Sequence, residues 1–561
     1  MDRRTLLAIG LMLIIAVLPT LLNPRRPDPQ AVADSLATGL DSAVASLDSV
    51  EAQATPPETV FVQQPAAALQ AVEGVTPPPV PALVEGDPVV VESPLYRFTF
   101  STRGARLTGA ELMEYRTFAP GDSGNAHLVP DGGRFLEYGL VVGSDTIHLA
   151  DWDFVPSAST LTVNAPGTPL TLVAERGVVA VELTYTFDPD HYLFDVTGRV
   201  SGIEGSGIAV IGLSPRMRQI EADSADNFRS YAVVTKAGKT ERLNFRSLDP
   251  GEARALPGPF EWVAIKSKYF VTAVMTLDEG QPQLGGAIAI GGPKPGRHST
   301  NTDVAMSLPA PGGGFAFSVY IGPQEYKRLS RIGHEFGDVN PYGWILRPII
   351  RPFANIIVVI LLWMHENLNL EYGWVLILFG LAVRVVLWPL NQKAMKSGVA
   401  MQAIQPELKA VQERYKQDPQ RMQQEVMKLY KVHQVNPLGG CWPMLIPMPV
   451  LFALFFVFRE TIEFRGVSFL WLPDLSRPDP YYIIPILMGL SMFGVSKIGQ
   501  IGVPPNPQTK MMLYMMPAFL TFIFLRLSSG LNLYYAVSNI ASIPQQWLIA
   551  KQRLKRLGKR E

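Results

Sequence analysis

The chain has 561 residues, 47% hydrophobic and 17% charged, and its 49 basic and 49 acidic side chains leave a formal net charge of zero. That balance excludes a broadly basic nucleic-acid-binding protein. A single cysteine, Cys441, excludes an internal disulfide and a cysteine-based metal cluster. Residues 89–335 have the composition of a soluble, strand-rich protein, whereas residues 341–550 have that of a membrane protein.

The amino-terminal segment 1–23 carries two arginines before an apolar run from Leu6 to Leu22. This pattern predicts a transmembrane signal anchor, with a cleaved signal sequence as the alternative. Residues 24–88 follow. They are rich in Pro, Ala, Asp and Glu and show no sustained apolar period, so we expect a disordered linker.

Residues 89–336 contain segments in which apolar and polar residues alternate, separated by Gly, Pro, Asp and Asn clusters. Alternation of period two is typical of strands with one buried face, so we expect a large antiparallel β-sandwich. The histidines show no metal-ligand spacing and no catalytic site is visible, so we expect neither a metal nor a cofactor. The clearest segments are LYRFTF (95–100), VELTYTF (181–187), YLFDVTGRV (192–200), KYFVTAVMTL (268–277) and GGFAFSVYIG (313–322).

Residues 341–369 combine two arginines and three prolines with an apolar, aromatic-rich helical pattern. This mixture predicts an interfacial amphipathic helix along the outer membrane surface, with a further spanning helix as the alternative. The interfacial interpretation lets the next apolar run start on the side that the later loop charges require.

Five apolar runs long enough to span a bilayer follow, and with the anchor they predict six transmembrane helices. Residues 393–433 carry eight basic against four acidic side chains, and the tail 551–561 carries six against one. We therefore expect both segments and the amino terminus in the cytoplasm, and the β domain on the other side of the membrane, which is the periplasm in a cell that has one. The five runs lie at about 373–391, 437–459, 481–498, 510–528 and 531–550.

Arg384 interrupts the first of these runs, and no Asp or Glu lies between Trp374 and Lys393. At about 1.5 Å per residue it lies roughly 15 Å beyond Trp374 and about 13 Å before Lys393, near the centre of a hydrocarbon core about 30 Å thick. A cation at that depth costs about 2.5 to 3.5 kcal/mol on insertion scales, so we expect Arg384 to face a polar cavity. Snorkelling to the interface is the alternative.

Residues 393–433 contain two runs of apolar residues at helical spacing, separated by Asp418 and Pro419. Aspartate is a favoured N-cap and proline a favoured first helical residue, so the loop is predicted to be a helical hairpin. A passive connector is the alternative, but the loop is longer than a connector needs.

The span at 437–459 contains Pro443, Pro447 and Pro449. Each proline frees a backbone carbonyl that lipid cannot satisfy, so we expect this kinked half to face protein or water. The last span carries polar residues at i, i+3, i+4, i+7 and i+11, which lie on one helix face. Such a stripe can simply hold helices together, but beside Arg384 it favours a water-filled groove. The stripe consists of Tyr535, Ser538, Asn539, Ser542 and Gln546.

Long motifs occur in order along the second half: YGW at 342–344, an arginine-containing span ending in WPL, KVHQVNPLGGCWP at 431–443, WLPDLS, DPYYIIPILMG, and SSGLNLYYAVSN at 528–539. They closely resemble the YidC-type membrane protein insertases of the YidC/Oxa/Alb family. The resemblance is dense across 341–550. It is looser in the β domain, where EWVAIKSKYFVTAVM at 261–275 is similar to the periplasmic domain of Gram-negative members.

The resemblance implies a five-helix insertase core at 370–550 with a hydrophilic groove, and a β-supersandwich of sugar-mutarotase-like shape in the periplasm. It implies that Arg384 is the groove arginine and that Tyr535 contacts substrate. It also implies nascent membrane proteins, membrane lipid, the ribosome and the Sec translocon as partners. Two positions depart from the family pattern: Pro447 stands where many members have glutamine, and Gly380 stands where a polar residue is common.

No Walker-type glycine loop and no nucleophile–base pair is visible in the core, so we expect insertion without nucleotide hydrolysis and not an enzyme. A nascent chain's polar flank would enter the groove, Arg384 would attract its acidic residues, and partitioning of the hydrophobic segment into lipid would drive insertion. One alternative is a secondary transporter of a small anion that binds at Arg384, although the internal repeats of such proteins are absent. Another is a sugar-binding or sugar-isomerising β domain.

Overall fold

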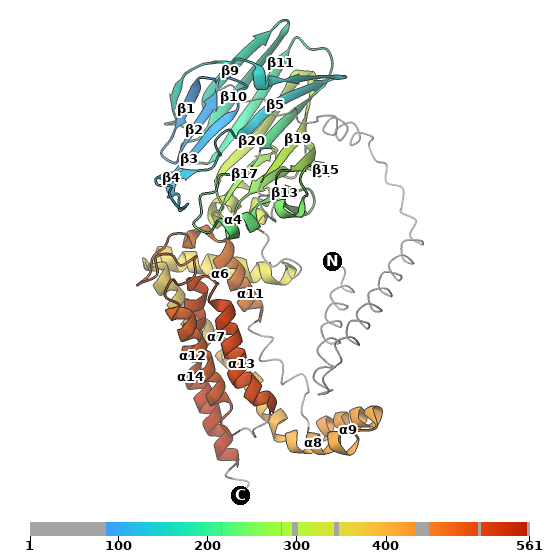
Figure 1. The fold of residues 1–561 in the computed structure, drawn as a ribbon, viewed down its shortest axis with the longest axis vertical. Coiled ribbons are helices and arrows are strands. Elements are labelled where there is room, and N and C mark those ends of the chain that lie inside the picture. The colour runs from blue at the N-terminus through green and yellow to red at the C-terminus, as the bar shows by residue number, and fades with distance from the viewer. Residues whose placement is uncertain are drawn as a thin grey trace. The chain divides into compact units, whose positions relative to one another are not determined.

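The computed structural model describes residues 86–557, apart from 215, 282, 294–300, 341–346, 434–447 and 503–506 (Figure 1). The expected signal anchor at 1–23 and nearly all of the expected linker at 24–88 lie outside these residues.

The described residues between 86 and 323 form two β-sheets, of 11 and 9 strands. The first sheet consists, in spatial order, of β15 (Ala253–Phe260), β18 (Leu284–Gly291), β19 (Thr302–Ala310), β12 (Gly207–Ser214), β5 (Arg134–Val142), β3 (Leu107–Arg116), β2 (Tyr96–Ser101), β1 (Pro88–Glu92) and β8 (Thr160–Thr162), with β4 (Asn125–His127) beside β3 and β6 (Asp145–His148) beside β5. The second consists of β14 (Thr240–Asn244), β13 (Ala232–Lys236), β16 (Trp262–Lys266), β17 (Phe270–Met275), β20 (Gly314–Pro323), β11 (Leu193–Ser201), β10 (Val179–Phe187), β9 (Thr168–Arg176) and β7 (Val155–Pro156).

The two sheets pack face to face through aromatic side chains. The ring of Phe98 on β2 lies 5.6 Å from that of Phe194 on β11, and Phe100 lies 4.7 Å from Tyr185 on β10. Burial alternates along β11 with period two, which is what one buried sheet face requires. The predicted sandwich is therefore confirmed, and each of the five segments expected to form strands contains one, namely β2, β10, β11, β17 and β20.

Three neighbouring strands of the second sheet depart from that alternation. β13, β16 and β17 are buried along their whole lengths, so both faces of this part of the sheet are covered. The simple rule of one buried and one exposed face fails here because other parts of the chain pack on the second face. One consequence is that Lys266, at the end of β16, is fully buried.

The carboxyl-terminal region is helical. Its helices are α6 (Arg347–Leu368), α7 (Tyr372–Ala403), α8 (Gln405–Arg414), α9 (Pro419–Val432), α11 (Met448–Glu460), α12 (Ile483–Gly499), α13 (Pro507–Phe524) and α14 (Ser529–Leu557), and two short helices, α4 (Ser224–Ser230) and α5 (Tyr326–Ile332), precede them. Within the described residues, α6 and Tyr372–Pro389 of α7 are long and apolar enough to cross a membrane, while α12 and Leu513–Phe524 are apolar but shorter. The count of six spans stays a prediction.

Helix α6 has apolar residues all round. Ile350, Ala354 and Ile357 are buried against the helical core, whereas Ile356 and Trp363 on other faces are more than half exposed. Figure 1 shows α6 running across the direction of α12 and α14. The interfacial position of this helix stays a prediction.

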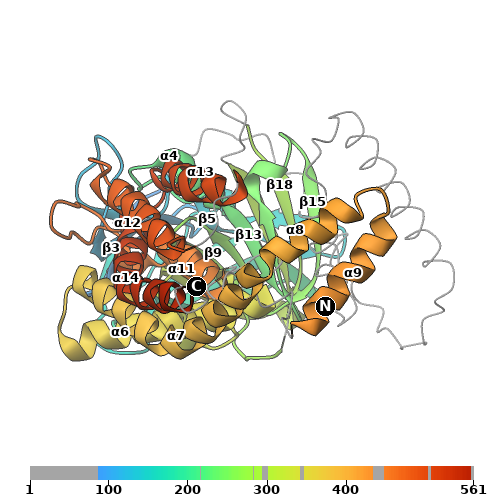
Figure 2. The ribbon, with the colours of Figure 1, turned by 90° about the horizontal axis from the view of Figure 1, so that it is seen from below.

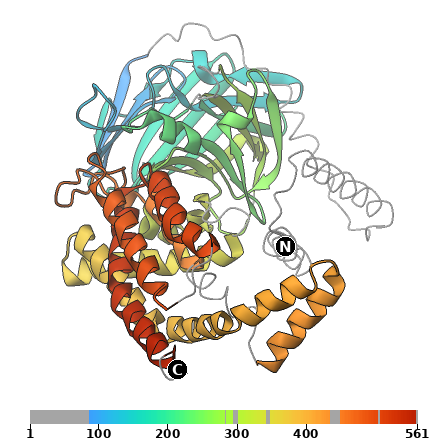
Figure 3. The ribbon, with the colours of Figure 1, turned by 60° about the horizontal axis from the view of Figure 1, so that its bottom comes forward.

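Helix α7 continues beyond the predicted end of its apolar run near 391 and ends at Ala403. The span and the start of the expected hairpin region are thus one helix, and α8 and α9 follow side by side (Figure 2, Figure 3). The side chain of Asp418 accepts the Arg421 N–H at 3.0 Å, and Pro419 opens α9, which confirms the predicted cap. His433 Nε2 lies 2.8 Å from Glu407 Oε2 and joins α9 to α8.

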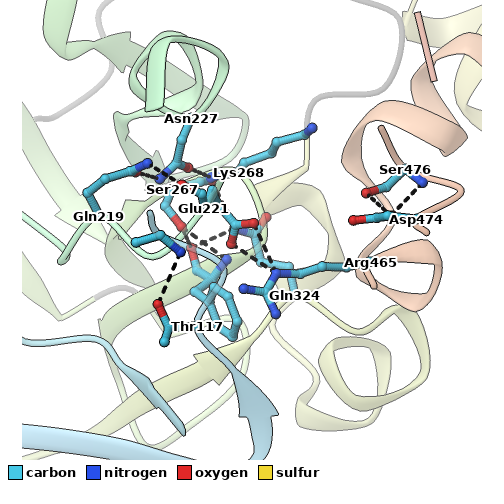
Figure 4. A network of polar contacts seen from close by, with 12 residues as sticks. Thr117, Gln219, Glu221, Asn227, Ser267, Lys268, Gln324, Arg465, Asp474 and Ser476 are labelled. Atoms are coloured by element: carbon cyan, nitrogen blue, oxygen red, sulfur yellow. Dashed lines mark hydrogen bonds and ion pairs between the residues drawn. The ribbon is translucent and has the colours of Figure 1, made fainter. Parts of the chain in front are cut away.

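Ion pairs join the β-sandwich to the segment after α11 (Figure 4). Arg465 Nε donates to both carboxylate oxygens of Glu221, at 2.9 and 3.1 Å, and its guanidinium lies 4.4 Å from the centre of the Phe118 ring. Both side chains are more than nine-tenths buried. Burial raises the pKa of the Glu221 carboxyl even though Arg465 opposes that shift. The contact is therefore a desolvated ion pair that packs against an aromatic ring.

A second buried ion pair lies close to the first in sequence. Lys266 Nζ donates to Asn340 Oδ1 at 2.7 Å and lies 3.4 Å from Glu460 Oε2 at the end of α11. Burial lowers the pKa of Lys266 to about 8. Near these pairs the Glu463 carboxylate accepts the Tyr326 N–H at 3.1 Å.

Candidate functional site

Arg384 lies in α7 and points toward α14. Its Nε donates hydrogen bonds of 2.9 Å to both the carbonyl oxygen and Oγ of Ser538. One turn earlier Gly380 faces α14, and a Cβ at this position would lie 3.5 Å from Tyr534 and Val537, an ordinary contact. The guanidinium is thus held by a serine of α14. The sequence analysis expected Arg384 to face a polar cavity but did not pair it with this serine.

The Arg384 side chain borders a cavity of about 530 Å³ among α7, α11, α12, α13 and α14. We call this cavity the cleft. Its polar lining comes from α7 and α14 and consists of Arg384, Tyr534, Tyr535, Ser538 and Asn539, whereas α11, α12 and α13 contribute apolar side chains such as Phe455 and Met488. The described residues that line the cleft include no carboxylate. One wall therefore carries an uncompensated positive charge and the other is hydrophobic.

Tyr535 lines the cleft, and its Oη is buried without a hydrogen-bond partner among the described residues. Its ring lies 5.4 Å from that of Phe524 in an edge-to-face arrangement, which fixes the ring while leaving the hydroxyl unused. A buried hydroxyl without a partner costs about 1 to 3 kcal/mol. It is therefore a group that a bound molecule would stabilise.

The rest of the predicted stripe on α14 has mixed roles. Asn539 lines the cleft and donates to Ser491 Oγ of α12 at 3.3 Å. Ser542 is buried and donates to the Asn539 carbonyl at 2.6 Å, and Gln546 is partly buried and is not part of the cleft lining. Part of the stripe thus holds helices together, as the alternative interpretation expected, and part faces the cavity.

Three polar positions of the helical region escaped the sequence analysis. Gln545 is buried and its Nε2 donates to the Trp388 carbonyl of α7 at 3.1 Å. It stands seven residues after Ser538 and so on the same helix face, a spacing that would have found it. Asn532 donates to the Phe524 carbonyl at 2.9 Å, and Ser491 has no signal in the sequence beyond being polar in an apolar helix.

Only one of the three prolines singled out in the third span, Pro449, lies among the described residues. Pro443 and Pro447 lie outside the described residues, and Pro449 is the second residue of α11. The effect of proline in place of the family's glutamine at position 447 is therefore untested. Gly380, the other position that differs from the family pattern, lies beside α14.

Taken together, the chain combines a bundle of apolar helices around a cleft with one arginine in its wall and a β-sandwich domain. This is the architecture of a membrane-integral protein with a cavity among its helices, joined to a β-sandwich domain in which the sequence indicates no catalytic site.

Comparison with known proteins places it within that class. The model of the 60Kd inner membrane protein family matches residues 363–556, and the model of the YidC periplasmic domain matches residues 88–356. The membrane protein insertase YidC of Chloroherpeton thalassium is 32% identical over 83% of this chain and 83% of its own length. That of Chlorobaculum tepidum is 30% identical over 97% of this chain and 94% of its own length. A crystal structure titled as an active YidC insertase covers 83% of this chain and 95% of that chain at 18% identity, with a TM-score of 0.33.

The chain belongs to the YidC family of membrane protein insertases. It is a protein of the inner membrane that acts in the insertion of membrane proteins, and its family is one of insertases rather than enzymes.

Proposed function

We propose that the cleft is the groove in which this insertase receives the polar flank of a nascent membrane protein. The observation that carries the proposal is Arg384, which donates its Nε to Ser538 while no carboxylate lines the described part of the cleft. A guanidinium has five N–H donors, so Arg384 keeps donors for a carboxylate of the entering chain. The unused Tyr535 hydroxyl adds a donor or acceptor beside it.

The two walls of the cleft suit the two parts of such a substrate. Polar and acidic residues of the flank would lie against α7 and α14, while the hydrophobic segment would lie against α11, α12 and α13 and pass from there into lipid. Burial of each apolar side chain contributes about 1.5 to 3 kcal/mol. A segment of about 20 residues thus supplies a driving force without nucleotide hydrolysis or a covalent intermediate.

The proposed topology follows the loop charges. Six transmembrane helices would place the amino terminus, the hairpin 393–433 and the tail 551–561 in the cytoplasm, and the β domain, with a supersandwich architecture, in the periplasm. The proposed domains are the anchor 1–23, the linker 24–88, the β domain 89–336, the interfacial helix 341–369 and the insertase core 370–550.

The hairpin would receive the nascent chain, the ribosome or the Sec translocon at the cytoplasmic mouth of the groove. This proposal is supported by exposed apolar side chains on the hairpin. Helix α9 has no buried residue, and Met427 and Val432 are 47% and 76% exposed. Replacing residues 396–430 by a short Gly/Ser linker should abolish insertion while the thermal stability of the core is kept. Insertion at the wild-type rate would make the hairpin a passive connector.

Site-specific photo-crosslinking tests the groove itself. A photoreactive amino acid at Tyr535 should crosslink to ribosome-stalled nascent membrane proteins. The matched control is Leu490 of α12, which is 64% exposed and does not line the cleft. Equal crosslinking at both positions, or none at Tyr535, would contradict a substrate groove at the cleft.

A further inference from the structure

A second cavity, of about 720 Å³, lies at the β-domain ends of the helices. It is bordered by α4 of the sandwich, the end of α11, the segment before α12 and the connection from α13 to α14. Five basic side chains border this cavity, namely Arg229, Lys268, Arg459, Arg477 and Arg526. We call it the basic cavity.

The carboxylates that border the basic cavity are already occupied. Asp226 accepts from Lys268 Nζ at 2.8 Å, and Asp223 accepts the Asp226 N–H at 2.9 Å as the cap of α4. Asp479 accepts the N–H groups of Tyr481 at 3.0 Å and Ile484 at 2.8 Å. These acids keep their charge, and Asp226 also lies 3.8 Å from Arg229. The five basic side chains nevertheless outnumber the three carboxylates that border the cavity, which leaves an excess of two positive charges.

Three of the arginines have little or no compensation. The side chains of Arg477 and Arg526 are exposed and form no ion pair or side-chain hydrogen bond with the part of the chain that the structure describes. The buried Nε of Arg459 lies 3.5 Å from Oε1 of its neighbour Glu460, an ion pair that does not form a hydrogen bond. The cavity thus carries a net positive charge that a bound anion would neutralise.

These arginines also contradict the usual charge distribution of a membrane protein. Arg459 and Arg526 stand at the carboxyl ends of α11 and α13, and Arg477 lies in the segment before α12. In the topology proposed above, these helix ends face away from the cytoplasm. Basic residues are normally concentrated at the cytoplasmic end. In the proposed topology, positions beside the ends of the apolar helices would lie at the depth of the lipid phosphate groups.

The remaining wall of the basic cavity is apolar. Phe455, Leu527 and Leu531 border it, and the same three residues border the cleft on their other side. A cationic rim next to an aromatic and aliphatic wall matches an amphiphile that has an anionic head and a hydrocarbon chain. An acidic peptide would match the rim but leave the apolar wall unused.

We propose that the basic cavity binds an anionic phospholipid of the adjacent leaflet. Arg477 and Arg526 hold the phosphodiester through charge-assisted hydrogen bonds, and the charge of Arg459 adds to the attraction. The first part of an acyl chain lies against Phe455 and Leu531. The bound lipid closes the space between α4 and the helix ends. Through Phe455, Leu527 and Leu531, it supports the wall of the cleft.

Native mass spectrometry of the full chain in detergent, titrated with phosphatidylglycerol or phosphatidylcholine, tests this. The wild type should retain one phosphatidylglycerol more tightly than phosphatidylcholine. Because a hydrogen bond to a charged group contributes enough for roughly a tenfold change in affinity, Arg477→Gln with Arg526→Gln should weaken phosphatidylglycerol by at least about tenfold. The control pair, Lys239→Gln with Arg331→Gln, removes two exposed charges from the β domain and should bind like the wild type.

Thermal unfolding in the absence of lipid should be the same for the wild type and both pairs of substitutions. The proposal is overturned if the cavity variant binds phosphatidylglycerol like the wild type or if phosphatidylcholine binds equally well. It is also overturned if inorganic phosphate displaces phosphatidylglycerol at equal concentration, which would indicate a free-anion site. Crosslinking of an acidic nascent tail to position 477 with no retained lipid would instead assign the cavity to substrate. Since these measurements need no insertion activity, their failure leaves the groove proposal untouched.

Discussion

The β-sandwich and the helical cleft both bury charged or polar groups, but they treat them in opposite ways. At the sandwich, Arg465 is desolvated together with Glu221, and Lys266 lies beside Asn340 and Glu460. In the cleft, Arg384 has a serine but no carboxylate, and the Tyr535 hydroxyl has no partner among the described residues.

The difference indicates what the buried polar groups do in each region. A buried charge that is paired within the chain is a structural contact, and removing one partner leaves the other uncompensated. A cationic side chain beside an unoccupied cavity has spare capacity for a molecule that enters it. We therefore expect substitutions at the sandwich to change stability and substitutions in the cleft to change insertion.

The largest expected effect on stability is that of Arg465→Met. It leaves the buried Glu221 carboxylate without its partner, which costs on the order of 3 to 5 kcal/mol. Thermal or denaturant unfolding in detergent measures it. The double variant with Glu221→Met should recover most of the loss, since apolar replacements of a buried pair are often tolerated. An unfolding midpoint like that of the exposed control Arg331→Met would show that the pair is not a structural contact.

Glu463 provides a pH-dependent test on the same side of the comparison. Burial raises the pKa of its carboxyl from 4.5 to about 7, with Glu325 adding to the rise and Lys327 opposing it, and Oε2 has no hydrogen-bond partner among the described residues. The folded state therefore binds this proton more tightly than the unfolded state. At about 1.4 kcal/mol per pKa unit, stability falls by up to about 3 kcal/mol as the pH rises from 4.5 through 7.

Glu463→Gln keeps the acceptor oxygen and removes the charge. It should stabilise the protein at pH 8 by up to about 3 kcal/mol and change little at pH 4.5, as measured by unfolding at both values. A gain of equal size at both pH values would mean that the carboxyl does not titrate in this range.

In the cleft, Tyr535→Phe should raise stability by about 1 to 3 kcal/mol, because it removes a buried hydroxyl that has no hydrogen-bond partner among the described residues. Insertion of a substrate with a polar flank should nevertheless slow. A marked loss of stability would place the hydroxyl in a structural bond and weaken the contrast between the two regions.

The smallest expected effect is that of Gly380→Ala. The added Cβ would meet Tyr534 and Val537 at ordinary contact distance, and alanine favours a helix over glycine by about 0.8 to 1 kcal/mol. Stability should be equal or slightly higher and insertion unchanged. A loss of insertion at unchanged stability would show that this space is needed by the substrate.

The sequence predicted what local rules determine. Alternation located β2, β10, β11, β17 and β20, and the Asp418 cap followed from side-chain chemistry alone. The Arg465–Glu221 pair could not be predicted, because its partners are 244 residues apart and each is unremarkable in its own segment.

Only the part of the cleft lining that follows a local pattern could be predicted. Arg384, Tyr535, Ser538 and Asn539 line it together, as the stripe on the last helix suggested. Its largely apolar lining was not expected, since the sequence favoured a polar, water-filled groove. The wall contributed by α11, α12 and α13 comes from helices without distinguishing polar residues, and only tertiary packing brings them opposite Arg384.

The central claim is that Arg384 acts on the negative charge of the substrate rather than on the fold. In a medium whose dielectric constant lies between those of water and protein, one carboxylate about 4 Å from the guanidinium contributes on the order of 4 kcal/mol before desolvation is counted. A quarter of that energy gives a several-fold effect on the insertion rate.

The measurement is insertion into proteoliposomes, with protease protection of the tail, for wild type, Arg384→Ala and Arg384→Lys. Two substrates are compared, one with several tail acids and one with these acids changed to Asn and Gln. Arg384→Ala should slow the acidic substrate several-fold and hardly affect the neutral one, and Arg384→Lys should retain most activity, all at unchanged thermal stability. Equal impairment of both substrates with a lowered unfolding temperature would contradict the claim and make Arg384 a residue that holds α7 to α14.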